Sequence, residues 1–206
     1  MSTFLNTLIA SLVLAGTGHA FAASSVDLSV KGLITPSACT PSLSSGGVVD
    51  LGKISAKDLK VIVPTMLSER SLEMSVKCDA ATLIAIEGKD NRAGSDFEGP
   101  YNFGFGLING SEKLGGMELT VNNLIADGVP ARTIESSDGG ATWYKGRVLG
   151  RLTMISVADA ATMAQIPVRE FSSDLKFFPL IAPTNTLTLD QEVVIDGSVT
   201  LTVRYL

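Results

Sequence analysis

The sequence predicts an all-β fold, either an antiparallel sandwich or a barrel. Short segments in which apolar and polar residues alternate recur along the chain, and this is the period of a strand with one buried face. Asn-Gly and Asp-Gly pairs, which favour tight hairpin turns, separate several of these segments. Glycine is abundant, with 20 in 206 residues, while apolar residues make up 45%. Many short strands joined by such turns are typical of sandwiches and barrels.

The predicted strands run from near the N-terminus to the last residue. In chain order they are residues 25–30 (continuing through 32 into 33–34), 71–77, 83–86, 103–108, 117–121, 149–155, 175–178, 193–195 and 197–206. The turn signals are residues 45–47, 109–110, 127–128, 138–140 and 196–197. An alanine-rich stretch, 157–165, ends before Pro167 and predicts a surface turn or a short helix. No repeat or linker interrupts this series, so we expect one domain.

The most regular of these segments is the last. Val199, Leu201, Val203 and Tyr205 would share one face of a sheet, and the residues between them would share the other. No later segment of this chain follows to cover the edge of that strand. Because an uncovered apolar edge promotes aggregation, we expect another strand to cover it.

The N-terminus predicts export. The first 22 residues contain no charged side chain, residues 5–16 form a short apolar run, and Ala20, Phe21 and Ala22 make a small-x-small cleavage signal. The run is too short to span a bilayer, so we expect a secretory signal peptide that is cleaved before Ala23. A signal anchor or a lipid anchor is the alternative, although no cysteine follows the cleavage site. Removing 22 of the 206 residues leaves 184, which is enough to bury a sizeable core.

Charge and cysteine usage narrow the class of protein. The net charge of −5 and the pI of ≈ 4.9 argue against nucleic acid or an anionic membrane surface as a partner. Charged residues make up only 18%, which suits an assembly or extracellular module. Cys39 and Cys78 are the two cysteines of an exported chain and predict one disulfide; two free thiols or half of a metal site are the alternatives.

The residues offer little catalytic chemistry. The one histidine, His19, lies in the predicted signal peptide, so the mature chain has no imidazole for a Ser-His-Asp or Cys-His arrangement or for a metal site with histidine ligands. Residues 90–96 carry oxygen-bearing side chains near a glycine, but their spacing is not that of an EF-hand loop. A polar turn with a buried Arg92–carboxylate contact is favoured over a calcium site. We expect no enzyme, no metal and no cofactor.

Three further motifs have a structural and a functional interpretation. Trp143 and Tyr144 could form a surface site for carbohydrate, although packing in the core or at a strand edge is favoured. Residues 109–111 form a glycosylation sequon, and here they favour a hairpin turn. The glycines at 104, 106 and 110 lack the spacing and the strand-then-helix context of a nucleotide loop, so they favour a strand that contains glycine.

Several features in order along the chain carry a resemblance to a known family. An alternating arm at 26–30 leads through 31–38 to Cys39, and the segment 71–78 brings in Cys78. Residues 49–52, with Leu59 after them, look like the strand that follows the first cysteine. Further matching pieces are residues 90–94, 105–107, 113–116 and 196–198, and the penultimate Tyr205. Together they resemble the subunits of chaperone–usher fimbriae, and within them a fimbrial-like group long catalogued as a domain of unknown function.

The resemblance implies an incomplete, pilin-type immunoglobulin-like antiparallel sandwich with an N-terminal donor arm. Residues 1–22 would be the signal peptide, 23–31 the donor-strand arm and 32–206 the pilin-like domain. The arm residues Val26, Leu28 and Val30 would fill the groove of another subunit. The groove edge, which a chaperone would also recognise, would be formed by Val199, Leu201, Val203, Tyr205 and Leu206, with the terminal carboxylate on the last.

The implied function is that of a non-enzymatic structural subunit of a bacterial surface fimbria. It would be exported to the periplasm and then to the cell surface. Its partners would be a periplasmic chaperone, an outer-membrane usher and other fimbrial subunits, with no nucleic acid and with membrane contact only through the usher in transit. Its length disfavours a tip adhesin, which adds a separate binding domain. The alternatives are a self-complemented, monomeric secreted β-sandwich that binds a ligand, and a carboxylate-dependent carbohydrate hydrolase.

Overall fold

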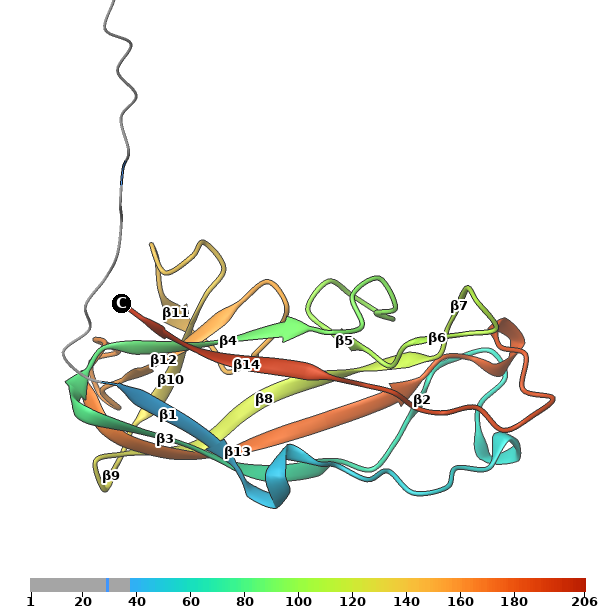
Figure 1. Ribbon diagram of the computed structural model, residues 1–206, viewed down its shortest axis with the longest axis horizontal. Helices are drawn as coiled ribbons and strands as arrows, with labels where there is room; N and C mark the ends of the chain where they lie inside the picture. Colours follow the sequence, from blue (N-terminus) through green and yellow to red (C-terminus); the bar gives the residue numbers. More distant parts are fainter. Residues whose placement is uncertain (1–28, 30–37) are drawn as a thin grey trace, which may run out of the picture. The chain divides into compact units, whose positions relative to one another are not determined.

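Two antiparallel sheets form the fold in this computed structural model, which describes residue 29 and residues 38–206 (Figure 1). The first sheet has the order β1-β3-β13-β8-β5, with β2 paired to β13 and β9 paired to β8; the second has the order β11-β10-β12-β4-β14. β6 and β7 form a separate small hairpin. The predicted all-β antiparallel sandwich is confirmed. The predicted signal peptide, residues 1–22, and the predicted arm residues Val26, Leu28 and Val30 lie outside the described residues.

The strands differ greatly in length. They are β1 Cys39–Leu43, β2 Thr65–Met66, β3 Arg70–Thr82, β4 Ile84–Asp90, β5 Phe103–Gly104, β6 Leu107–Ile108, β7 Glu112–Lys113, β8 Gly115–Ala126, β9 Val129–Pro130, β10 Arg132–Ser136, β11 Tyr144–Lys145, β12 Met154–Ala158, β13 Val168–Ile181 and β14 Val199–Tyr205. Three short 3₁₀ turns, η1 Ser44–Gly47, η2 Ala56–Asp58 and η3 Thr184–Thr186, are the helical elements among the described residues.

The core lies between the two sheets and follows the alternation of the long strands. On β3, Leu72, Met74 and Val76 are buried while their neighbours are more exposed, and on β13 Phe171 and Leu175 are buried in the same way. Burial of each such side chain stabilises the fold by about 1.5–3 kcal/mol. β3, β13 and β8 therefore form the continuous base against which the second sheet packs.

Strand register defines two ends of the sandwich. At the first, which we call the disulfide pole, Cys39 pairs with Cys78, Val168 with Thr82 and Phe171 with Ala126. The end of β14 lies here too, because Tyr205 pairs with Ile84. At the other, which we call the loop pole, Ile181 pairs with both Thr65 and Gly115. β14 therefore runs toward the disulfide pole.

Most of the predicted strands form, but two do not. Residues 193–195 and 49–52 belong to no sheet. In the second of these, the carboxylate of Asp50 accepts a hydrogen bond from the Gly52 N–H at 2.7 Å and bends the chain. Residues 49–52 alternate and residues 193–195 form a short apolar run, but neither segment has a neighbouring strand to pair with among the described residues. The prediction was therefore wrong in both places because a strand requires a partner as well as a pattern.

Smaller differences have local causes. The predicted strand 103–108 divides into β5 and β6 at Gly106, whose φ of +86° breaks the extended chain. Only the end of the predicted strand 149–155 is a strand, because β12 begins at Met154. The stretch 157–165 starts inside β12 and then turns, since the Asp159 carboxylate accepts hydrogen bonds from the N–H groups of Ala161 and Thr162. β10 was not predicted from the sequence.

Two of the predicted hairpin turns are confirmed by their backbone angles. Asn109 and Gly110 join β6 to β7 with φ values of 50° and 85°, and Asp127 and Gly128 join β8 to β9 with 48° and 80°. Positive φ at both central residues is the turn that matches the twist of antiparallel strands.

The predicted disulfide is also confirmed. Cys39 and Cys78 are bonded, and they are direct cross-strand partners on β1 and β3. The bond closes a loop with a sequence separation of 39 residues. It therefore anchors the edge strand β1 to the base of the sandwich at the disulfide pole.

Replacing both cysteines with alanine is expected to lower the free energy of unfolding by about 4 kcal/mol, because the unfolded chain regains the entropy that the closed loop removes. Urea unfolding of the oxidised and the substituted protein measures this difference. Wild-type protein under reducing conditions is the control and should match the variant. Equal stability of the oxidised and substituted proteins would contradict the expectation.

Candidate functional site

β14 is a long strand with one free edge. It pairs with β4 from Val199, opposite Asp90, to Tyr205, opposite Ile84, and no described strand pairs with its other side. The four predicted groove-edge residues of this strand share its inner face, where they are partly buried and packed on the core: Val199, Leu201, Val203 and Tyr205. The fifth, Leu206, is exposed. A row of backbone N–H and C=O groups is thus left without a strand partner.

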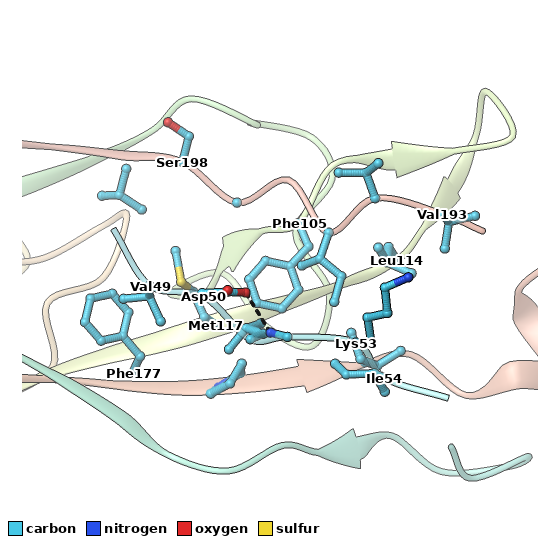
Figure 2. A pocket seen from close by; sticks show the side chains of 18 of the residues that line it. Val49, Asp50, Lys53, Ile54, Phe105, Leu114, Met117, Phe177, Val193 and Ser198 are labelled. Carbon is cyan, nitrogen blue, oxygen red and sulfur yellow. Dashed lines mark hydrogen bonds between the residues drawn. The ribbon is translucent and has the colours of Figure 1, made fainter. Parts of the chain in front are cut away.

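An apolar groove of about 680 Å³ lies beside the first half of β14 (Figure 2). Its floor is the buried surface of β8 and β13, including Leu119, Leu175 and Phe177. Phe105 and Leu114 extend the floor toward the loop pole and belong to a second apolar cluster with Ile181. The groove therefore exposes part of the surface that would otherwise be closed core.

Two irregular segments form the sides of the groove. Residues 47–56, which follow β1 and which we call the β1 wall, contribute Val49, Leu51 and Ile54; residues 189–198, which precede β14 and which we call the β14 wall, contribute Val193 and Ile195. These are the two places where strands were predicted and do not form. Across the mouth, Lys53 Nζ lies 4.0 Å from Glu192 Oε2 in an exposed ion pair, which contributes little to stability.

The β14 wall is held at both ends. At one end, Arg92 Nε and Nη2 donate to the two carboxylate oxygens of Asp196 at 2.8 and 2.7 Å. At the other, the Glu112 carboxylate accepts hydrogen bonds from the N–H and hydroxyl of Thr188 at 2.7 and 2.8 Å. Donation from Arg92 lowers the pKa of Asp196, and donation from the Thr188 N–H lowers the pKa of Glu112. Gly197, near the end of the β14 wall, lies so close to the Phe105 ring that a Cβ atom would not fit there.

The groove is closed toward the disulfide pole. The Tyr205 hydroxyl accepts a hydrogen bond of 2.9 Å from the Cys39 N–H and so joins β14 to β1 across the two sheets. Val199 and Leu201 line the groove, whereas Val203 and Tyr205 do not. The structure thus divides the predicted groove edge into an open half and a closed half, a distinction that the uniform alternation of the sequence does not contain.

Residues 90–96 form a polar turn with arginine–carboxylate contacts. The Asp90 carboxylate accepts hydrogen bonds from the N–H groups of Arg92 and Gly104 at 2.8 and 3.0 Å. Asp96 pairs with Arg151 at 2.8 Å. Within residues 38–206, no cluster of three or more His, Cys, Asp or Glu side chains is placed to hold a metal ion. The predicted polar turn with an arginine–carboxylate contact forms, and it connects to the β14 wall through Arg92. The prediction that this contact is buried was wrong, because the Arg92 and Asp196 side chains are 37% and 53% exposed.

The other two motifs are part of hairpins. Trp143 Nε1 donates to the Gly140 carbonyl at 3.0 Å, which holds the indole against the β10–β11 connection. The Asn109 side-chain amide donates to Glu112 and to the Thr188 carbonyl at 3.0 and 2.9 Å, so it serves the β6–β7 turn and the start of the β14 wall. Near Trp143, hydrogen bonds from Thr142 and Ser136 lower the pKa of Asp138 to about 2.

Comparisons with known proteins relate the chain to a family without an assigned function. Residues 28–115 match the family model described as a protein of unknown function (DUF1120). The protein GltF of Escherichia coli K12 is 25% identical over an alignment of 227 residues, gaps included. The alignment covers 87% of this chain and 88% of GltF. The uncharacterized protein YhcF of the same organism is 32% identical over 149 residues, covering 64% of this chain and 63% of YhcF. None of the described helical turns is long and apolar enough to cross a membrane.

Replacing Asp196 with Asn is expected to loosen the β14 wall, because the variant loses the charged partner of Arg92. Amide hydrogen exchange measures this loosening at two N–H groups. The N–H of residue 196 donates to the Phe105 carbonyl, and the N–H of Asn91 donates to the Ser198 carbonyl. Both should exchange faster in the variant. Asp190→Asn, an exposed change in the same segment, is the control and should leave the two rates unchanged.

Acidification should have the same effect as that substitution. Since the pKa of Asp196 is lowered in the folded protein, the contribution of its pair with Arg92 is fully present above the ordinary aspartate pKa of 3.8 and is lost as the pH falls through the lowered value. In wild-type protein, exchange at Asp196, corrected for intrinsic pH dependence, should accelerate in that acidic range. A pH-independent corrected rate would contradict the proposed anchor.

Proposed function

We propose that this protein is a structural subunit that assembles by accepting a strand from another chain into the groove beside β14, in the manner of chaperone–usher fimbriae. One observation carries the proposal: the free edge of β14 lies directly beside an apolar groove whose floor is core surface. An added strand satisfies both at once, because its backbone pairs with the edge while its alternate side chains fill the groove.

The two walls support a strand as the occupant rather than a compact ligand. The β1 wall and the β14 wall flank the groove, and each contains a segment rich in β-branched or apolar residues that pairs with no strand among the described residues. A strand inserted between them would offer backbone groups to both sides. A small apolar molecule would fill the volume but leave the edge of β14 unpaired.

The proposed donor is the arm of another copy or of a related subunit. Val26, Leu28 and Val30 share one face of an extended chain, so all three can point into a groove at once. Burial of each contributes about 1.5–3 kcal/mol, to which the backbone ladder adds. The lining side chains at the groove floor are apolar, which matches these three residues.

Export and the remaining partners are part of the same proposal. The Cys39–Cys78 disulfide supports folding in an oxidising compartment such as the periplasm. There, an apolar groove beside a free strand edge requires temporary cover, which a periplasmic chaperone would supply until an outer-membrane usher exchanges it for the arm of the next subunit. The proposed subunit is not an enzyme and needs no cofactor.

A self-complemented monomer that binds a ligand is the second candidate. It is favoured by the volume of the groove, which falls in the range of small-molecule pockets. In that case the arm would occupy the groove of its own chain. A refolded wild-type protein that stays monomeric and rejects added arm peptide would favour this candidate.

Substituting Leu201 with Arg should weaken binding of a synthetic peptide of residues 23–34 by about 10- to 100-fold, because a charge would replace an apolar side chain in the groove. Thr202→Arg is the matched control: it adds the same charge to the exposed face of the same strand and should change the affinity less than about twofold. Fluorescence anisotropy measures the affinity. Near-ultraviolet circular dichroism and a thermal melt establish that both variants are folded.

Deleting residues 23–31 should abolish polymers while leaving groove binding of the arm peptide intact. The deletion removes the donor and leaves the acceptor, so size-exclusion chromatography should show monomers only. Mixing the deletion protein with full-length Leu201→Arg protein should give a heterodimer and no longer species, because each supplies one half of the contact. Polymers of the deletion protein would show that the arm is not the donor.

A further inference from the structure

A short apolar surface on the loop pole has no assigned function. Residues 60–66, which we call the apolar loop, lead from η2 into β2 and include that short strand. They expose three successive β-branched side chains, Val61, Ile62 and Val63, with Ile62 at 77% and Val61 at 60% exposure. Met66 is also exposed. Scattered apolar residues on a surface are ordinary, but a contiguous group indicates a contact.

The apolar loop is held in one conformation. The Lys60 carbonyl accepts a hydrogen bond from the Thr184 N–H at 3.0 Å, and the Val61 carbonyl accepts one from Asn185 at 3.1 Å. The Lys60 N–H donates to the Thr65 hydroxyl at 2.8 Å. Because these bonds fix the backbone in advance, a partner that covers the loop pays little entropy to order it.

The apolar loop is continuous with the groove. Leu59, directly before it, lines the groove and packs on the second apolar cluster. Thr65 at its end pairs with Ile181, the last residue of β13. The loop therefore lies at the loop pole, where the groove is not closed by the contact between Tyr205 and Cys39.

Strand direction determines which part of a donor chain reaches this pole. Every strand pair in the described sheets is antiparallel, and antiparallel pairing is the more stable kind. β14 runs toward the disulfide pole, so an arm inserted antiparallel to it runs toward the loop pole and leaves the groove there. Only residues 31–38 then separate Val30 of that arm from Cys39, and eight residues reach at most about 26–29 Å.

This short reach brings the disulfide pole of the donor copy to the loop pole of the acceptor. The disulfide pole carries its own exposed apolar side chains, Ile125 and Val129, on the β8–β9 hairpin. The hairpin lies at this pole because Ala126 pairs with Phe171 at the start of β13.

We propose that the apolar loop is a second contact between successive copies, docking on the β8–β9 hairpin of the copy whose arm fills the groove. This inference rests on the proposed function. Each junction then joins two different surfaces, the loop pole of one copy and the disulfide pole of the next. Such a contact is not self-complementary and repeats without closing, as a fibre requires.

The test compares two ligands for the same groove. One is a shorter arm peptide of residues 23–30, which ends at Val30 and lacks the residues that leave the groove toward the apolar loop. The other is full-length Leu201→Arg protein, which brings its own disulfide pole but cannot accept a further copy. Ile62→Asp in the acceptor should leave the peptide affinity within about twofold and weaken the full-length donor by about tenfold or more. Leu152→Asp, an exposed change away from the apolar loop, is the control and should alter neither.

The donor side has its own variant. Val129→Asp in the full-length donor should reproduce the loss, and pairing Ile62→Asp with a Val129→Lys donor should recover part of it. Equal effects of Ile62→Asp on peptide and full-length donor would overturn the contact. Binding of the wild-type protein to lipid vesicles that Ile62→Asp abolishes, with donor affinity unchanged, would overturn it in favour of a membrane. If neither ligand binds, the proposed function itself fails, a result distinct from both.

Discussion

Among residues 38–206, one edge of β14 has no strand partner and lies beside an apolar groove, and the other features of the sandwich are arranged around that edge. Hydrogen-bonding groups of a strand need a partner, and apolar side chains need to leave water. One edge of β14 is hydrogen-bonded to β4, and Val199 and Leu201 are partly buried against the core. The groove is large enough to hold another strand, and the edge of β14 beside it is long enough to need a cover. In the proposed function, this incompleteness directs assembly.

The boundaries of the groove are held by polar contacts as well as by packing. The disulfide and the Cys39–Tyr205 hydrogen bond hold β1 and β14 together at one pole. Arg92 and Glu112 hold the β14 wall through Asp196 and Thr188. Val193 and Ile195 of that wall also pack on the second apolar cluster. Directional bonds and apolar contacts therefore fix the position of the wall together.

The two missing strands are informative about the site. Residues 49–52, which alternate, and residues 193–195, which form a short apolar run, were both predicted as strands and lie on opposite walls of the groove. Their side chains already face the groove, while their backbones remain outside any sheet. A strand pattern without a strand, next to a vacant strand position, is what a chain would show if its complete sheet included a segment from elsewhere.

Local chemistry was sufficient for much of this fold. Alternation predicted β3, β8 and β14, and short apolar segments predicted parts of β4 and β13. The Asn109 and Asp127 turns followed from residues that tolerate positive φ, and two cysteines in a chain with a predicted signal peptide predicted their own bond. Other features depended on residues far apart in the sequence. The closure of half the groove by Tyr205, the anchoring of the β14 wall by Arg92 and Glu112, and the failure of 49–52 and 193–195 to form strands all depend on neighbours that the chain meets only after folding. Periodicity states which face of a segment is apolar, but pairing and enclosure are decided by what lies across from it.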